Sequence, residues 1–197
     1  MNALVTSKAV WYVMRGSGVV SLLLLTGVVA LGILTSKRWQ PGRLPRFVTA
    51  GLHRSIALVS VAFVGLHVLT AVVDPYAVVG FASVFVPFVA GRKPLWVGLG
   101  AISLDLVLAL IVSSLLRSRL SARLWRGVHW LAYLAWPVAL AHGVGMGSDS
   151  RTPWLVGVTA ACLATVGALA AWRLLGPNPG SKRLQRGPTL RVEELRA

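Results

Sequence analysis

The four histidines of the chain form two couples with nearly equal spacing. His67 follows His53 by 14 positions, and His142 follows His129 by 13. On a helix these separations correspond to about 21 and about 20 Å along the axis. Two imidazoles at one level can hold a six-coordinate b-type heme between them, and two such levels can relay electrons. A dinuclear metal site does not fit this spacing, because its ions lie about 4 Å apart.

The facing angles of the two couples differ. At about 100° per residue, His67 returns to within about 40° of His53, whereas His142 lies about 140° from His129 on an ideal helix. Pro137 lies between His129 and His142. Because proline removes a backbone donor and kinks a helix, we expect a distortion there that turns His142 toward the partner helix. Helix–helix hydrogen bonding, zinc binding and proton relay remain alternatives for these histidines.

Long apolar blocks must position these side chains. Soluble domains carry about 25% charged residues, whereas this chain has 13%, with 56% hydrophobic residues and a mean hydropathy of +0.74. A helix of roughly 20 apolar residues spans a bilayer, and its backbone groups pair internally. The sequence therefore predicts an all-α integral membrane protein, a bundle whose spans cover residues 10–34, 47–73, 95–116, 124–144 and 154–175.

The second and fourth predicted spans carry all four histidines. These spans run parallel because one span separates them, and His53 and His129 lie at similar distances from the basic residues that precede them. We therefore expect His53 to meet His129 and His67 to meet His142. Residues 75–94 contain an apolar stretch that is too short to span and is expected to form a lid-like segment at one membrane face.

Basic residues predict the orientation of the spans. They concentrate in the first and third loops and in the tail, and such loops face the cytoplasm. The N-terminus should then lie outside the cell membrane and the C-terminus inside. The chain divides into a membrane domain, residues 1–175, and a basic cytoplasmic tail, residues 176–197. The residues behind this assignment are Lys37, Arg38, Arg43, Arg46, Arg117, Arg119, Arg123, Arg126 and the tail cations from Arg173 to Arg196.

Other site classes find little support. The net charge of +15 comes from loops between apolar blocks, and no basic stripe with interleaved aromatics predicts nucleic-acid binding. The single cysteine, Cys162, cannot form an intrachain disulfide or an iron–sulfur site. Asp105 lies inside the third span, where a proton-transfer role and a helix-pairing role are equally open. Small residues such as Gly27, Gly32, Gly98 and Gly100 predict close helix contacts rather than a binding site.

Two segments resemble the ferric reductase-like transmembrane domain. They are GLHRSIALVSVAFVGLHVL, at residues 51–69, and LWRGVHWLAYLAWPVALAHGVGMGSD, at residues 124–149. That family includes the membrane parts of ferric reductases and NADPH oxidases and the heme-binding membrane subunit of the methionine sulfoxide reductase system. The resemblance covers roughly residues 10–175, and the histidine spacing is its specific part. Many members have six spans, so the bundle is expected to have five or six helices.

The resemblance also implies roles for single residues. In the family, the two cytoplasm-side histidines share one heme and the two outer histidines share the other. His53 and His129 would then hold an inner heme b, and His67 and His142 an outer heme b. The segment WYVMRGSG, at residues 11–18, resembles a region where the family often has an arginine near the outer heme. Arg15 is therefore a candidate for a heme propionate or the reduced substrate, with an interfacial arginine as the alternative, and Arg54 is a similar candidate at the inner heme.

The function expected from these features is transmembrane electron transfer. No GxGxxG motif opens a helix, so no FAD- or nicotinamide-binding domain is expected in the chain. The protein would be an oxidoreductase component that receives electrons from a separate cytoplasmic flavin reductase and passes them to ferric iron, oxygen or a protein outside. The alternatives are a quinol-linked cytochrome b and a non-redox membrane scaffold subunit.

Overall fold

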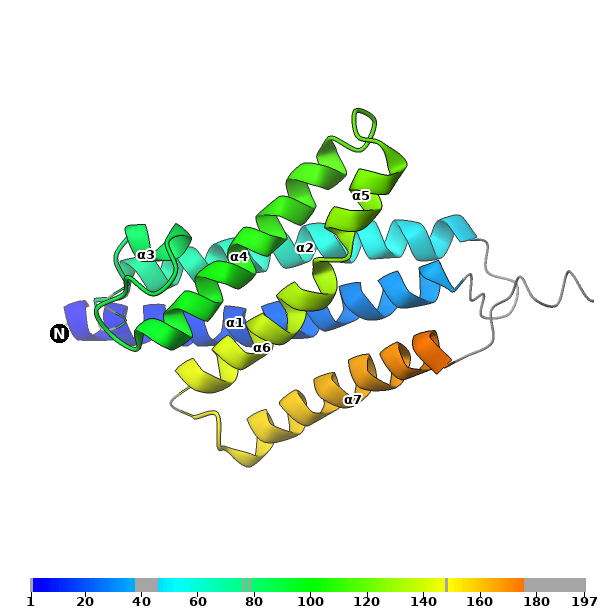
Figure 1. Cartoon of the computed structure of the whole chain (residues 1–197). Helices are drawn as coiled ribbons and strands as arrows, with labels where there is room; N and C mark the ends of the chain where they lie inside the picture. Colours follow the sequence, from blue (N-terminus) through cyan, green and yellow to red (C-terminus); the bar gives the residue numbers. More distant parts are fainter. Residues whose placement is uncertain (1, 38–45, 76, 78, 148, 176–197) are drawn as a thin grey trace, which may run out of the picture.

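The structure is a computed structural model that describes residues 2–37, 46–75, 77, 79–147 and 149–175. These residues are helical apart from their connections, which confirms the predicted all-α class (Figure 1). The predicted tail, residues 176–197, lies outside the described residues, as do Arg38 and Arg43 of the first loop. The helices are α1 (Asn2–Ser36), α2 (Arg46–Val73), α3 (Ala82–Phe85), α4 (Pro94–Leu115), α5 (Ala122–His129), α6 (Ala132–Met146) and α7 (Pro153–Leu175).

Four helices are long and apolar enough to cross a membrane. They are α1, over Lys8–Ser36, α2, over Phe47–Val73, α4, over Pro94–Leu115, and α7, over Pro153–Leu175. They correspond to the first, second, third and fifth predicted spans, because length and hydropathy are local properties of the sequence. The chain is therefore a multi-pass membrane protein, and only a minority of the residues on these helices are buried inside the bundle.

The fourth predicted span is divided into two helices. Helix α5 begins after Ser121, whose hydroxyl caps the N–H of Leu124 at 3.2 Å, and it ends at His129. At the junction the N–H of Leu131 donates to the carbonyl of Val128 at 2.9 Å, a bond that reaches back three residues instead of four. Such tightened turns advance by about 120° per residue instead of about 100°. The junction therefore changes both the direction and the winding of the chain between His129 and α6.

The distortion predicted at Pro137 is found upstream of that residue. Helix α6 continues through Pro137 without a break, and the interruption lies at Trp130 and Leu131. A proline is tolerated inside a membrane helix when neighbouring groups satisfy the backbone. The hydroxyl of Ser103 on α4 donates to the carbonyl of Ala135 at 3.1 Å, which ties α4 to α6 two residues before the proline. The prediction of a distortion between the two histidines was right, but its position was wrong.

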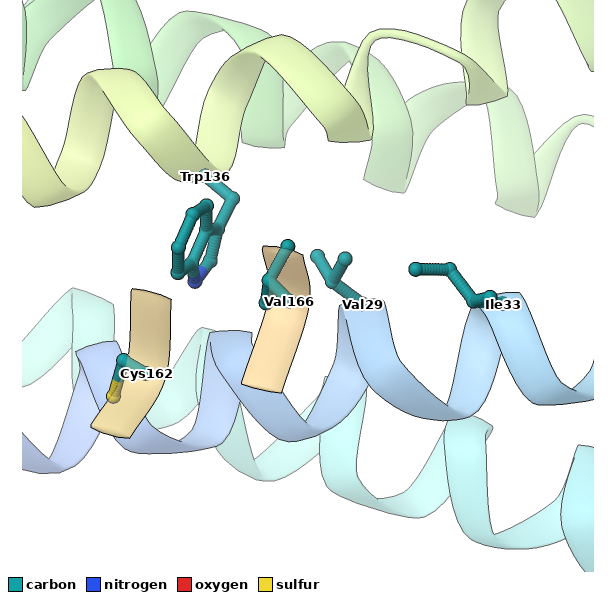
Figure 2. Close-up of a cluster of buried hydrophobic side chains, with 5 residues drawn as sticks. All are labelled: Val29, Ile33, Trp136, Cys162 and Val166. Carbon is teal, nitrogen blue, oxygen red and sulfur yellow. The ribbon is translucent and has the colours of Figure 1, made fainter. Parts of the chain in front are cut away.

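Helix α1 is the centre of the packing. It contacts α2, α6 and α7, while α4 packs against α6 (Figure 1). Figure 2 shows that the buried apolar cluster is made from α1, α6 and α7. Within this cluster the indole N–H of Trp136 donates to Thr26 Oγ1 at 2.9 Å, so a buried polar group is satisfied by the neighbouring helix. The cluster comprises Val29, Ile33, Trp136, Cys162 and Val166.

The segment between α2 and α4 packs on the end of α4. It contains α3, and Ser83, Val84 and Ala90 are buried within it. Phe88 and Lys93 have φ angles of 68° and 47°, which place both in the left-handed region. The Phe88 ring lies directly against Gly98, where a larger residue would collide with it. The segment's only helix in the described residues is the four-residue α3, in agreement with the prediction that this stretch is too short to span a membrane.

Candidate functional site

The four histidines meet in two pairs. The ring centres of His53 and His129 lie 6.3 Å apart, and those of His67 and His142 lie 6.2 Å apart. Helix α2 supplies one member of each pair, and α5 and α6 supply the other two. The junction between α5 and α6 is what allows both partners to face α2, because an ideal helix would turn them about 140° apart.

The separation within each pair suits one metal ion between two imidazoles. A metal–imidazole bond is about 2.0 Å long and a ring atom lies about 1.2 Å from the ring centre, so two imidazoles on opposite sides of one ion have centres about 6.4 Å apart. Both measured distances agree with this value. Among the described residues, no three His, Cys, Asp or Glu side chains gather as a metal-binding group. Two-histidine coordination leaves four positions for a planar ligand such as a porphyrin.

Three of the histidines are hydrogen-bonded through Nδ1 to a backbone carbonyl of another helix. His53 Nδ1 lies 3.0 Å from the Val28 carbonyl oxygen, and His67 and His142 make the same contact at 2.8 and 2.7 Å. A carbonyl oxygen only accepts, so Nδ1 must carry the proton and Nε2 keeps its lone pair. A donor bond of this kind orients a ligand imidazole and raises its basicity. The acceptors for His67 and His142 are the carbonyls of Met14 and Trp96.

His129 is held differently from the other three. Its Nδ1 is buried and has no hydrogen-bond partner in the part of the chain that the structure describes. Its ring stacks on Trp125, one turn earlier on α5, with ring centres 4.8 Å apart and planes inclined by 19°. The guanidinium of Arg117 lies over the Trp125 ring, 4.0 Å from its centre. Stacking therefore takes the place of the backbone hydrogen bond at this histidine.

A cavity of about 400 Å³ adjoins the His67–His142 pair. Both histidines line it, together with Gly18, Gly100 and mainly apolar side chains from α1, α2, α4 and α6. Binding sites for organic cofactors are concave and largely apolar, with a few polar groups that orient the ligand. The cavity and the two imidazoles therefore fit a porphyrin, and the donor set fits its iron.

Comparison with protein families gives one match. The family described as ferric reductase like transmembrane component matches residues 17–140, which is more than half of the chain. The chain belongs to the ferric reductase-like transmembrane family. Members typically bind heme, which agrees with the fit of the histidine pairs. Comparison with curated proteins and with solved structures found no match.

Two functional candidates of this ferric reductase-like chain lie just outside the matched segment. They are His142 and Arg15, and both line the cavity. Arg15 forms an ion pair with Asp149, which follows α6, and its guanidinium lies 5.8 Å from the Trp11 ring centre. Arg15 thus lies beside the same cavity as His67 and His142, and it has an anionic partner in the protein.

The remaining candidates of the ferric reductase-like chain occupy less enclosed positions. Arg54 follows His53 on α2, but its side chain is exposed, as is that of Asp105 at the middle of α4. Sequence reasoning did not find Trp125 or the carbonyls that orient the histidines. The 14-residue interval between Gly18 and Gly32, which equals the interval between His53 and His67, was an available signal.

Proposed function

We propose that the chain is a diheme b-type cytochrome that carries electrons across the membrane. The observation that carries this proposal is the 6.2–6.3 Å separation of ring centres in both histidine pairs. His53 and His129 would hold an inner heme, and His67 and His142 an outer heme. Bound heme supplies one-electron redox chemistry, and two axial imidazoles favour electron transfer over ligand activation.

The protein's own groups have separate tasks in this proposal. The carbonyls of Met14, Val28 and Trp96 hold three ligands in the tautomer that presents Nε2. Mainly apolar walls surround the outer pair, and Arg15 would offer a cation to a propionate there. Arg54 would do the same near the inner pair.

The proposed topology has five spans, with α5 and α6 together forming the fourth. The N-terminus would lie outside and the C-terminus in the cytoplasm, as the basic loops predict. Arg117, Arg119, Arg123 and Arg126 are exposed around α5, close to the His53–His129 pair. This end would face the cytoplasmic donor.

The donor and acceptor are proposed by chemical class. A separate flavin-containing reductase would give electrons singly to the inner heme, and ferric iron, oxygen or a protein would accept them from the outer heme. The chain is then an oxidoreductase component rather than a complete enzyme. A quinol donor is tested by comparing reduction of the purified protein by a flavin reductase with reduction by a soluble quinol.

The decisive experiment counts hemes in the purified full chain. A pyridine hemochrome assay with protein quantitation should give two b-type hemes per chain. The variants His53→Ala, His67→Ala, His129→Ala and His142→Ala should each lose the heme of their own pair and keep most of the other. His67→Met serves as the matched control because methionine can still act as an axial ligand. A colourless protein after expression with ample heme would overturn the proposal and favour a scaffold role.

A further inference from the structure

A glycine accompanies each of the three carbonyl-bound histidines. In every case the glycine lies four residues after the carbonyl that accepts the Nδ1 proton, on the same helix face one turn further along. The imidazole therefore lies over the glycine while it reaches the carbonyl. The three sets are Met14 and Gly18 for His67, Val28 and Gly32 for His53, and Trp96 and Gly100 for His142.

The space over these glycines differs in a graded way. A methyl group at Gly100 would lie 2.7 Å from Cε1 and Nδ1 of His142, and one at Gly18 would lie 3.0 Å from the same atoms of His67. A methyl group at Gly32 would lie 3.5 Å from His53 Cε1, an ordinary van der Waals contact. Alanine would therefore displace His142 most, His67 less and His53 hardly at all.

Helix α1 repeats this arrangement at the interval of the histidines themselves. Gly18 and Gly32 are 14 positions apart, as are His53 and His67 on the antiparallel helix α2. Fourteen residues make nearly four full turns, so both contacts fall on one face of each helix. The spacing of His53 and His67 on α2 thus equals the spacing of the two glycines on α1 over which their imidazoles lie.

Helix α4 provides this arrangement only once. The position 14 residues after Gly100 is Ser114, and the carbonyl 14 residues after Trp96 belongs to Leu110. That carbonyl accepts a hydrogen bond from Ser113 Oγ at 3.1 Å. Ser114 thus occupies the position where a glycine would leave room for an imidazole. His129 stacks on Trp125 and makes no hydrogen bond to a carbonyl in the described part of the chain.

We propose that Gly100 and Gly18 are positioning residues for the outer heme ligands. By leaving room for the imidazoles of His142 and His67, they keep Nδ1 at the carbonyl and Nε2 toward the iron. This inference rests on the proposed function, because the ligand role of the histidines is part of it. The two pairs then differ in how they are held. Both outer imidazoles are hydrogen-bonded to the backbone, whereas in the inner pair only His53 is.

The test compares Gly100→Ala, Gly18→Ala and Gly32→Ala in the full-length protein. The controls are Gly16→Ala on α1 and Gly65→Ala on α2, where a methyl group meets nothing within 4 Å. All five changes give the same gain in helix propensity. The readouts are heme per chain during dilution and the electron paramagnetic resonance signal of each low-spin ferric heme, which reports the angle between the two imidazole planes.

The expected result is a graded and selective loss. Gly100→Ala should weaken retention of the outer heme by about 10–100-fold, the usual effect of disturbing a ligand's supporting hydrogen bond. Gly18→Ala should shift the same resonance with a smaller loss, and Gly32→Ala should behave like the controls. The inner heme signal should remain unchanged in both outer-site variants.

Two different failures can be told apart. A wild-type protein without heme would reject the proposed function. A wild-type protein with two hemes, together with equal retention in Gly100→Ala, Gly18→Ala and Gly16→Ala, would reject the positioning role alone. If Gly100→Ala does not accumulate as folded protein, Gly18→Ala decides the question. The new methyl group at Gly18 would lie 3.0 Å from His67, which is less close than the 2.7 Å at Gly100, and the resonance shift is still measurable.

Discussion

Arg15 on α1 forms an ion pair with Asp149, which follows α6. The two side chains are 20% and 32% exposed, so the pair is partly shielded from solvent. It ties the first helix to the connection between α6 and α7, at the end of the bundle that contains His67 and His142. Because Arg15 also lines the cavity there, this carboxylate and any anionic group in the cavity would share one guanidinium.

The first prediction concerns this ion pair. A double-mutant cycle with Arg15→Gln and Asp149→Asn should give a coupling of about 1 kcal/mol or less, because the pair retains some solvent access. The measurement is thermal unfolding in detergent at low and high salt, and the coupling should shrink as salt rises. Arg151→Gln, an exposed arginine two residues after Asp149, is the control and should leave stability unchanged. Equal losses from Arg151→Gln and Arg15→Gln would contradict a specific pair.

The second prediction concerns Trp136 and Thr26 in the apolar cluster. Trp136→Phe removes one buried hydrogen bond and should reduce the free energy of unfolding by about 1 kcal/mol. Thr26→Val should cost more, about 1–3 kcal/mol, because it leaves the indole N–H of Trp136 buried without an acceptor. Adding Trp136→Phe to Thr26→Val should then recover part of that loss.

Thermal unfolding of the four proteins measures this cycle. Trp172→Phe is the matched control, since Trp172 is 39% exposed on α7. Strictly additive losses in the double variant would show that the two side chains act independently.

The third prediction concerns Trp125, which stacks on His129. Trp125→Leu removes an aromatic partner worth roughly 1 kcal/mol, so retention of the inner heme should fall by roughly 2- to 10-fold. Arg117→Ala should have a smaller effect in the same direction, because the guanidinium of Arg117 lies over the ring of Trp125. The outer heme should be unaffected by both changes.

Heme loss during dilution, followed by absorbance, measures the effect on each site. Trp154→Leu is the control, because Trp154 is an exposed tryptophan at the start of α7, away from His129. Equal losses in Trp154→Leu and Trp125→Leu would show a general effect on the bundle instead of a contact with His129.

Local sequence properties predicted most of the helices. The boundaries of α2, α4 and α7 agree with the predicted spans to within one residue at each end. Hydropathy determines these boundaries because every residue of a span must tolerate hydrocarbon, whatever its neighbours are. Helix α1 extends further toward the N-terminus than the predicted span, from Asn2, since a helix can continue beyond the apolar block.

The fourth predicted span shows where local reasoning stops. Its composition predicted one helix with a distortion at Pro137, but the structure places the break at Trp130 and Leu131. The break is marked by hydrogen bonds that reach back three residues instead of four, such as the bond from the Leu131 N–H to the Val128 carbonyl. Contacts from another helix, such as the hydrogen bond from Ser103 to Ala135, also act on this region and cannot be identified from spacing within one helix.

By itself, the sequence determined that this is an all-helical membrane protein and that its histidines are spaced for two matched levels, because hydropathy and helical rise act along one chain. Only the tertiary structure decided which faces meet. It brought His142 to His67 despite an unfavourable angle, supplied carbonyls from α1 and α4 to three imidazoles, and left His129 stacked on Trp125. These outcomes depend on the rotation and register of separate helices, which are set by close packing at residues such as Gly18 and Gly100.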